Sequence, residues 1–246
     1  MVEPGPHGFS WQGGRVARFQ TYQRIARFYD LIDLPFEYSR YRRLRPLLFE
    51  GLNGRLLDAG VGTGRNMPFY PPGSEVIGVD ISPAMLLRAR RRRGQSRAEV
   101  QLRQMDVTNL DFPDATFDAI VASFLFCTLP EEDQLPALKE VARVLKPGGI
   151  LRLLDYTRPS RGLRLLLTRL WEPRAKWAFG ASFDRHPEKY FEEAGLKMAR
   201  KTFVVDDLIA LVETRRQRRG VPTGTGCAIQ LEARNGHAIS TLRLPG

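Results

Sequence analysis

A glycine-rich turn and a carboxylate that follows it are the residues of this chain whose types and spacing most clearly suggest chemistry. Residues 56–64 read LLDAGVGTG, a short apolar run that ends in Gly60, Gly62 and Gly64. Glycine has no Cβ, so a turn of this kind lets the backbone approach a ligand closely. Asp80 ends the next apolar run about 20 residues later, the usual place for a carboxylate that holds ribose hydroxyls. The spacing therefore indicates a site for a nucleotide-like ligand.

Two other interpretations of the turn have to be weighed. A glycine cluster alone could be only a tight strand-to-helix turn, or it could belong to a dinucleotide site. The dinucleotide fingerprint spaces its glycines G-x-G-x-x-G, whereas the third glycine here comes one residue early and Arg65 stands where that fingerprint has glycine. A dehydrogenase is therefore disfavoured. Acidic residues at the ends of further apolar runs, Asp58, Asp106 and Asp155, favour a ligand site over a plain turn.

The chain that must position these residues alternates short apolar runs with helical patterns. Helices are expected from Ser82-Pro83 to about residue 93, from the acids at 131–133 to the KPGG stop at 146–149, and briefly over 186–194. This alternation predicts an α/β fold, a doubly wound, mostly parallel, seven-stranded sheet with helices on both faces. The expected strands are 55–58, 75–80, 99–104, 118–123 and 150–154, with two closing strands at 196–205 and 208–213.

Several segments together resemble the motifs of class I S-adenosylmethionine-dependent methyltransferases. Residues 58–64 (DAGVGTG) resemble the first motif, and 78–82 (GVDIS) resemble the motif of the second strand. Residues 105–107 (MDV) with 117–120 (FDAI) resemble the adenine-side motif and the fourth strand, and 145–149 (LKPGG) resemble the turn into the fifth. The similarity runs through residues 50–156. It implies the Rossmann-like fold of that family and S-adenosyl-L-methionine as the cofactor.

Carried over position by position, the resemblance implies a role for each matching residue. The backbone around Gly60 and Gly62 would face the methionine moiety, and Asp80 would hold the ribose. The acid at the end of the first strand, Asp58, would order the loop and the amino group of the ligand. Asp106 would bind the adenine amino group, although it and Asp80 could instead only cap helices or turns. The implied cofactor-binding residues are Asp58, Gly60, Gly62, Gly64, Asp80, Ile81, Asp106, Val107 (against the adenine ring) and Ser123.

Methyl transfer from a sulfonium is an in-line displacement on an activated carbon, so the protein mainly positions the acceptor and excludes water. The reaction requires no metal and no covalent nucleophile. A general base is needed only where the acceptor must lose a proton. Tyr29, Asp155 and His186 are the catalytic candidates. His186 could equally be a surface residue at a helix start, and Cys127 is better explained as a buried packing residue.

Composition, pattern and the resemblance together divide the chain into parts. Residues 1–14 are expected to form a flexible leader and 15–50 an N-terminal helical lid. Residues 51–214 would form the cofactor-binding domain, with an acceptor-side insertion at 160–195. Residues 215–246 would form an arginine-rich tail or hairpin.

The acceptor has to be inferred from residues outside these common motifs. Residues 125–129, 169–173 and 179–181 resemble a narrower group, which includes quinone C-methylases, methyltransferase-like thiol methyltransferases and bacterial phospholipid N-methyltransferases. This resemblance implies a small hydrophobic or amphiphilic acceptor, namely a quinone precursor, a phospholipid headgroup or a thiol. The aromatic residues of 171–183 could line its pocket, rest on a membrane interface or simply pack in the core.

The net charge of +11, from 38 basic and 27 acidic residues, bears on the partners of the protein. Such an excess can attract nucleic acid or an anionic membrane surface, or it can reflect only compositional bias. An RNA methyltransferase is therefore an alternative. Against it, residues 123–126 read SFLF where an Asn/Asp-Pro-Pro-aromatic motif for base amino groups would stand. A non-catalytic regulatory subunit that binds S-adenosylmethionine is a further alternative.

Targeting signals are not evident in the sequence. It shows no run of about 20 apolar residues and no start that resembles a signal peptide. Its two cysteines, Cys127 and Cys227, suggest neither a disulfide framework nor a metal site. We expect a cytoplasmic protein that can meet an anionic membrane peripherally. The sequence leaves its oligomeric state open.

Overall fold

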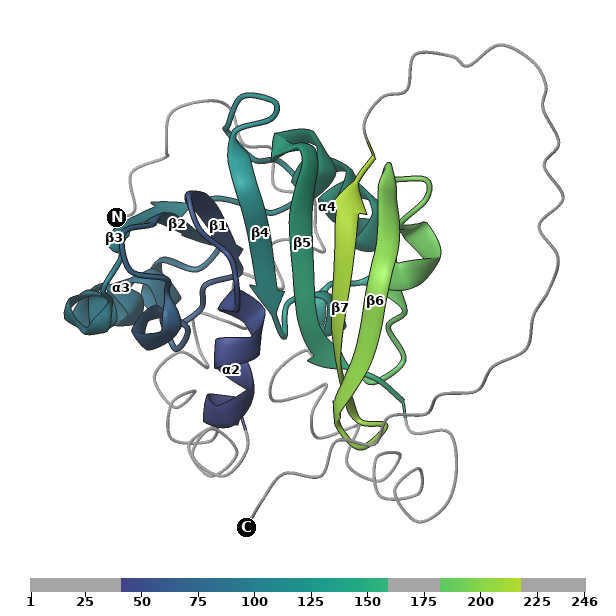
Figure 1. Cartoon of the computed structure of the whole chain (residues 1–246), viewed down its shortest axis with the longest axis horizontal. Helices are drawn as coiled ribbons and strands as arrows, with labels where there is room; N and C mark the ends of the chain where they lie inside the picture. The colour runs from purple at the N-terminus through teal and green to yellow at the C-terminus, as the bar shows by residue number, and fades with distance from the viewer. Residues whose placement is uncertain (1–40, 159–181, 218–246) are drawn as a thin grey trace, which may run out of the picture.

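A seven-stranded sheet forms the centre of the molecule (Figure 1). The structure is a computed structural model, and it describes residues 41–158 and 182–217. The strand order is β3-β2-β1-β4-β5-β7-β6. Strands β1 to β5 are parallel to one another, and β7 runs antiparallel to both β5 and β6. The predicted α/β fold with a mostly parallel seven-stranded sheet is confirmed.

The elements have the following bounds. The strands are β1 (Arg55–Ala59), β2 (Glu75–Asp80), β3 (Glu99–Gln104), β4 (Phe117–Ser123), β5 (Leu145–Tyr156), β6 (Leu196–Val205) and β7 (Ile209–Arg216). The α-helices are α2 (Arg42–Phe49), α3 (Pro83–Arg92) and α4 (Glu131–Val144). The 3₁₀ turns are η2 (Met67–Phe69), η3 (Arg93–Gln95), η4 (Phe126–Thr128) and η5 (Pro187–Tyr190). Among the described residues, no helix is long and apolar enough to cross a bilayer.

Two strands extend three residues or more beyond a predicted end. β5 begins at Leu145 rather than at residue 150, because Leu145 pairs with Phe117 before a turn at Gly148 (φ +80°) shifts the register. β7 extends to Arg216, which pairs with Leu196 of β6, so the first residues of the predicted tail belong to the sheet.

The short helix predicted over 186–194 is wrong for most of its length. Only η5 is helical, as a single 3₁₀ turn, and the residues up to Gly195 form hydrogen-bonded turns. Phe191 and Leu196 are both buried, and the Leu196 amide donates to the Phe191 carbonyl at 2.8 Å. Core packing therefore closes this segment onto β6 before a full helix can form.

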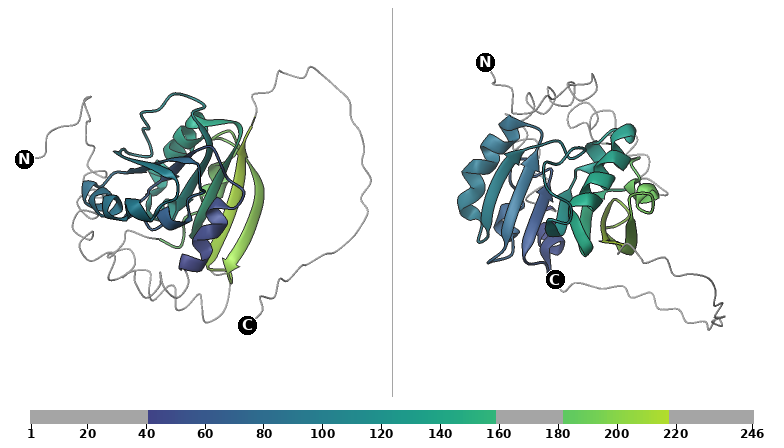
Figure 2. Two further views of the ribbon diagram at one scale, coloured as in Figure 1. Left: turned by 60° about the vertical axis from the view of Figure 1, so that its left-hand side comes forward. Right: turned by 90° about the horizontal axis from the view of Figure 1, so that it is seen from above.

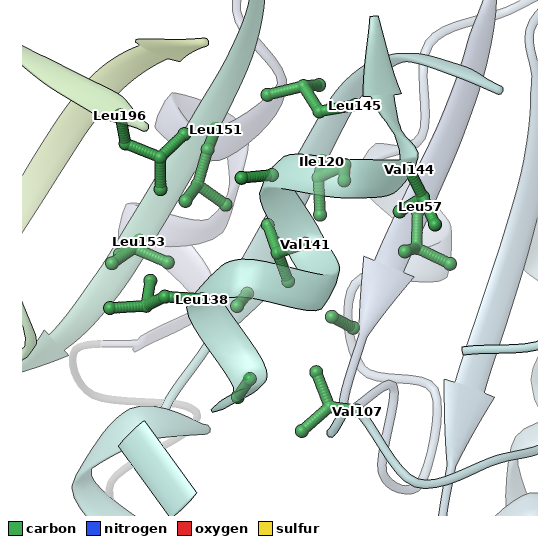
Figure 3. Close-up of a cluster of buried hydrophobic side chains, with 14 of the residues drawn as sticks. Leu57, Val107, Ile120, Leu138, Val141, Val144, Leu145, Leu151, Leu153 and Leu196 are labelled. Atoms are coloured by element: carbon green, nitrogen blue, oxygen red, sulfur yellow. The ribbon is translucent and has the colours of Figure 1, made fainter. Parts of the chain in front are cut away.

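Helices cover both faces of the sheet (Figure 2). On one face α4 packs over β1, β4 and β5 through a buried apolar stripe that includes Leu138 and Val141 (Figure 3). On the other face α2 and α3 contribute buried residues such as Leu48 and Leu86. Because β1 and β4 are covered on both faces, their residues are buried almost continuously rather than alternately. Because β1 to β5 are parallel, their carboxyl ends lie along one edge of the sheet, which we call the carboxyl edge.

Parts of the expected organisation lie outside the described residues. These are the leader, Tyr29 and most of the N-terminal lid, residues 159–181 of the acceptor-side insertion, and the tail from residue 218 onward. The division of the chain into these parts stays a prediction.

Candidate functional site

The carboxyl edge brings together side chains that are far apart in the sequence. Asp58 lies near the end of β1, and Asp80 is the last residue of β2. Ser123 ends β4, and Asp155 is next to last in β5. Because these strands are parallel, all four positions lie along one edge of the sheet (Figure 1). The sequence predicts each of them as a site residue, and the fold brings them to the same edge of the sheet.

The glycine turn after β1 is anchored to the end of β2. The amides of Gly60 and Val61 both donate to the Val79 carbonyl at 2.9 Å, and the amide of Gly62 donates to Asp80 Oδ2 at 2.9 Å. The φ angles of Gly60 and Gly62 are +72° and +55°, in the left-handed region that favours glycine. The turn is thus held in a backbone conformation that other residues rarely adopt.

The three glycines of the turn have different surroundings. A Cβ at Gly62 would have no neighbour among the described residues closer than 3.9 Å, so on their side the space beside this residue is open. A Cβ at Gly60 would lie 2.8 Å from Leu125. A Cβ at Gly64 would lie 2.9 Å from Met67 and 3.1 Å from the α3 backbone. The open space at Gly62 fits the approach of the predicted cofactor, whereas Gly64, also predicted on the cofactor side, is required for packing against α3.

Alanine at Gly62 and at Gly64 is expected to separate ligand binding from folding. Gly64→Ala places a methyl group against Met67 and α3 at φ +83°, which should lower the free energy of unfolding by about 2–4 kcal/mol. Gly62→Ala should cost only backbone strain of about 1–2 kcal/mol, yet its methyl group would enter the space expected for the ligand. Urea denaturation and calorimetric titration with S-adenosylmethionine measure the two effects. Unchanged affinity in Gly62→Ala would place the ligand elsewhere.

Asp80 is well placed to hold a ligand hydroxyl. Its Oδ1 accepts from the Ser82 amide at 2.8 Å, and its Oδ2 accepts from the Gly62 amide at 2.9 Å. Burial raises the pKa of Asp80 to about 6, although these two hydrogen bonds act to lower it. The carboxylate is therefore mostly ionised at neutral pH. Each of its oxygens has a further lone pair, so both can still accept a hydrogen bond from a ribose.

Asp58 is completely buried within a polar network. Its carboxylate accepts from Asn66 Nδ2 at 3.0 and 3.2 Å and from the Tyr70 hydroxyl at 2.6 Å. Asn66 Oδ1 accepts from Arg45 of α2 at 2.6 Å, and Asn66 Nδ2 donates to Ser123 Oγ at 3.0 Å. Burial raises the pKa of Asp58 to about 6, against the lowering effects of Tyr70, Asn66 and Arg45. We call these five residues the buried polar network, and it gives both Asp58 and Ser123 a role in ordering the loop.

Sequence reasoning missed three members of this network, Arg45, Asn66 and Tyr70. Asn66 and Tyr70 follow the glycine turn but belong to no motif considered above. Arg45 is 5% exposed and lies on the same face of α2 as Leu48 and Phe49. A lone arginine on the apolar face of a helix is the one signal that could have identified it, because such a charge is rarely buried without a partner.

The remaining predicted cofactor-binding residues, Asp106 and Val107 on the adenine side and Ile81, lie just after β3 and β2. Asp106 is buried, and its Oδ1 accepts from the Thr108 amide at 2.9 Å and from the Thr108 hydroxyl at 2.8 Å. Val107 is buried in the core layer beneath α4 (Figure 3). The carbonyl of Ile81 accepts from Gln104 Nε2 at 3.2 Å. Asp106 therefore shapes its own turn, and its contact with adenine stays a prediction.

Asp155 is the catalytic candidate that lies at the carboxyl edge. Its Oδ2 accepts from the Cys127 amide at 2.9 Å, and its Oδ1 accepts from the Tyr156 amide at 2.9 Å. Burial raises the pKa of Asp155 to about 6 against the lowering effect of these contacts. The carboxylate therefore orders η4 and can also exchange a proton close to neutral pH. Cys127 is 1% exposed, in agreement with its interpretation as a packing residue.

His186, the other catalytic candidate among the described residues, lies apart from Asp155. Its imidazole is half-exposed, and its ring nitrogens lie 3.7 Å from Asp184 and 3.9 Å from Glu188 on its own segment. This placement is that of a surface residue just before η5. Within residues 41–158 and 182–217, no group of His, Cys, Asp and Glu side chains is arranged to hold a metal ion.

Four aromatic side chains form a row at the carboxyl edge, which we call the aromatic wall. It consists of Tyr41, Phe124, Tyr156 and Phe183, whose consecutive ring centroids lie 4.9, 5.0 and 5.0 Å apart. The hydroxyls of Tyr41 and Tyr156 share a hydrogen bond. Phe124 has a φ of +53°, a strained conformation for a bulky residue, which places its ring between the two tyrosines. Tyr41 and Phe183 are buried, whereas the rings of Phe124 and Tyr156 are partly exposed and can contact a planar ring or an alkylated ammonium group.

Comparisons with known sequences agree with this geometry. A family profile described as a methyltransferase domain matches residues 56–149. A phosphatidylethanolamine N-methyltransferase of Cereibacter sphaeroides is 41% identical over 111 residues, which cover 44% of this chain and 54% of that protein. A demethylmenaquinone methyltransferase of Thermus thermophilus is 35% identical over 160 residues, which cover 62% of this chain and 72% of that protein. The chain thus spans about half of the first relative and about seven tenths of the second.

Solved structures of other proteins share the fold. An S-adenosylmethionine-dependent methyltransferase from Thermotoga maritima has a TM-score of 0.63 and 21% identity, covering 81% of this chain and 100% of that one. A second, from Aquifex aeolicus, has a TM-score of 0.57 and 21% identity, covering 79% of this chain and 98% of that one. At this level of identity, the likeness shows the fold alone.

Proposed function

The chain belongs to the S-adenosylmethionine-dependent methyltransferases, and from this premise we propose that it methylates a small amphiphilic acceptor drawn from a lipid phase. The acceptor classes are a quinone precursor, a phospholipid headgroup or a lipid-soluble thiol. The aromatic wall beside Asp155 is the observation that carries the proposal. The names of the two relatives, which refer to phosphatidylethanolamine and demethylmenaquinone, support acceptors of this kind.

The aromatic wall suits the reacting heads of these acceptors. The ring of a quinone precursor can pack edge to face or offset on Phe124 or Tyr156. An amine headgroup is cationic before and after methylation, and a cation is attracted to the face of an aromatic ring. The carboxylate of Asp155, in the residue next to Tyr156, adds to that attraction. The apolar body of either acceptor would remain outside this row.

The residues of the chain mainly position the cofactor and the methyl acceptor. The backbone at Gly60 and Gly62 and the Asp80 carboxylate would hold the cofactor, which when bound supplies a methyl group already activated on a sulfonium. The aromatic wall orients the acceptor and excludes water. Asp155 is the group proposed to receive the proton of a phenol or an ammonium, because a carboxyl with a pKa of about 6 is mostly ionised at neutral pH. Tyr29 and His186 are the rival bases.

The test uses methyl-labelled S-adenosylmethionine with the purified protein and a cell extract, separated afterwards into organic and aqueous phases. Protein-dependent label is expected in the organic phase, and phosphatidylethanolamine vesicles and a reduced, demethylated naphthoquinone then serve as defined acceptors. Phe124→Ala should lower incorporation while leaving the affinity for S-adenosylmethionine unchanged. Label confined to aqueous macromolecules would replace the proposal with an RNA or protein acceptor. Binding of S-adenosylmethionine without any transfer would favour the regulatory subunit.

A further inference from the structure

Helix α3 and the turn after it carry an arginine cluster that the proposed site does not use. Residues 83–104 contain seven arginines and a single acid, Glu99. Arg90, Arg91, Arg93 and Arg97 are exposed, and none of them forms an ion pair with an acid of the described residues. We call these four residues the α3 arginine cluster.

Many other basic side chains on the described surface are neutralised, so the α3 arginine cluster differs from them. Their ion pairs have N–O distances of 2.6 to 2.9 Å. The pairs are Lys139 with Glu193, Arg143 with Asp114 and Glu140, Lys146 with Asp118, and Lys201 with Glu188. Within residues 41–158 and 182–217, the positive charge of the α3 arginine cluster is thus not neutralised by an acid.

An exposed leucine lies beside these arginines. Leu87 is 52% exposed, and Arg90 and Arg91 follow it by three and four residues, so the three side chains share one face of the helix. The opposite face of the helix packs in the core, where Leu86 and Ala89 are buried. Leu87 thus places an exposed apolar group next to two of the exposed arginines.

The helix that carries this surface is fixed to the cofactor loop. Arg92 Nη1 donates to the Thr63 carbonyl at 2.6 Å, and Gly64 packs against the α3 backbone at Ala89. In both Figure 1 and Figure 2, α3 lies at the outer end of the sheet, beside β3. A partner on the outer face of α3 would therefore contact an element joined directly to the glycine turn.

We propose that the outer face of α3 docks on an anionic lipid bilayer, with the α3 arginine cluster on headgroup phosphates and Leu87 in the interfacial region. This proposal rests on the proposed function, because an enzyme whose methyl acceptor lies in a lipid phase has to reach that phase. Arginine and an apolar side chain on one helical face are the combination that interfacial helices use.

Two other occupants fit the surface less well. Single-stranded nucleic acid is usually held by aromatic side chains on which bases stack, and residues 83–98 contain no aromatic residue. A second copy of the chain, joined through the same face, would set arginine against arginine. The exposed leucine gains free energy only where an apolar environment receives it.

The experiment compares two charge reversals in the full chain, both on exposed residues without ion pairs among the described residues. One variant is Arg90→Glu with Arg91→Glu on α3, and the matched control is Lys197→Glu with Arg200→Glu on β6. Binding is measured by co-sedimentation with vesicles of phosphatidylserine and phosphatidylcholine, without cofactor. The α3 variant should bind about 30-fold more weakly or worse, and the control within about threefold of wild type. Leu87→Ser should weaken binding about tenfold.

Three outcomes would overturn the inference. Equal losses in the two variants would mean that only net charge matters, and equal binding to vesicles of pure phosphatidylcholine would mean that the arginines are not used. Displacement of the vesicles by a structured RNA that requires Arg90 and Arg91 would assign the surface to nucleic acid. Because no methyl transfer is measured, failure of the docking proposal is distinguishable from failure of the proposed function.

Discussion

Alanine in place of Asp80 should weaken the binding of S-adenosylmethionine at least tenfold, about 1.4 kcal/mol or more. The carboxylate ends β2 at the carboxyl edge and fixes the Gly62 amide at 2.9 Å. Its loss removes the hydrogen-bond acceptor predicted for the ribose hydroxyls. It also removes the hydrogen bond that anchors the glycine turn to β2. Isothermal titration calorimetry measures the affinity, and urea denaturation shows whether the variant is folded.

A second acid provides the matched control for this variant. Asp118 lies near the start of β4, at the opposite edge of the sheet, where it accepts from Lys146 at 2.6 Å and from the Arg55 amide at 2.9 Å. Asp118→Ala also removes a hydrogen-bonded carboxylate, but away from the predicted ligand. Its affinity for S-adenosylmethionine should equal that of the wild type. If both variants lost affinity equally, the effect would come from the sheet and not from the site.

The pKa of Asp80 adds a pH dependence to the same prediction. Burial raises this pKa to about 6, so the ionised form that accepts hydroxyl hydrogen bonds is present above pH 6 and lost as the pH falls. Between pH 7.5 and pH 5 the wild-type affinity should therefore decrease about tenfold. Asp80→Asn cannot titrate and should remove most of this decrease. A wild-type affinity that is constant over the range would contradict a role for the ionised carboxylate.

The parts of this fold that the sequence predicts are those with local signals. The apolar runs of β1 and β4 mark strands buried on both faces. Ser82 starts α3 as expected from its position before Pro83, and its Oγ accepts from the Met85 amide at 3.3 Å. Because strands joined through helices run parallel, the acids at their ends lie at the carboxyl edge. The cofactor side of the site can therefore be predicted from local sequence patterns and strand topology.

The acceptor side depends on contacts between distant segments, which no local pattern encodes. Tyr41 and Tyr156 are joined through their hydroxyls although 115 positions separate them. Phe124 takes part only because its backbone adopts φ +53° after β4. The helix predicted over 186–194 fails for the same reason, since the packing of Phe191 and Leu196 overrides helical propensity. Tertiary contacts decide these elements, and they became visible only in the folded chain.

The buried polar network leads to a second prediction with a large expected effect, this time on stability. Arg45→Met places a long apolar side chain in α2 but removes the positive charge of the buried polar network, which is also the donor to Asn66 Oδ1. Asp58, completely buried, would then lose a charge that lowers its pKa. Removing one member of a buried charged pair costs about 3–5 kcal/mol when the other stays ionised. We expect a loss near the lower end of this range in urea denaturation at pH 8, because Asn66 separates the two groups.

The sign of the pH dependence distinguishes charge from packing in this variant. The pKa of Asp58 is about 6 in the folded wild type and about 3.8 for an unperturbed aspartate, so the neutral form is favoured by folding and the associated stability is lost as the pH rises through 6. Without Arg45 the folded pKa should rise further, and the extra loss should develop between about pH 5 and pH 8. At pH 5, where Asp58 is mostly protonated in both proteins, the difference should be small. Arg45→Met with Asp58→Asn should recover much of the stability at pH 8, since no buried charge is then left alone. A loss that is equal at both pH values and is not recovered by the double variant would mean that Arg45 acts only through the packing of its side chain.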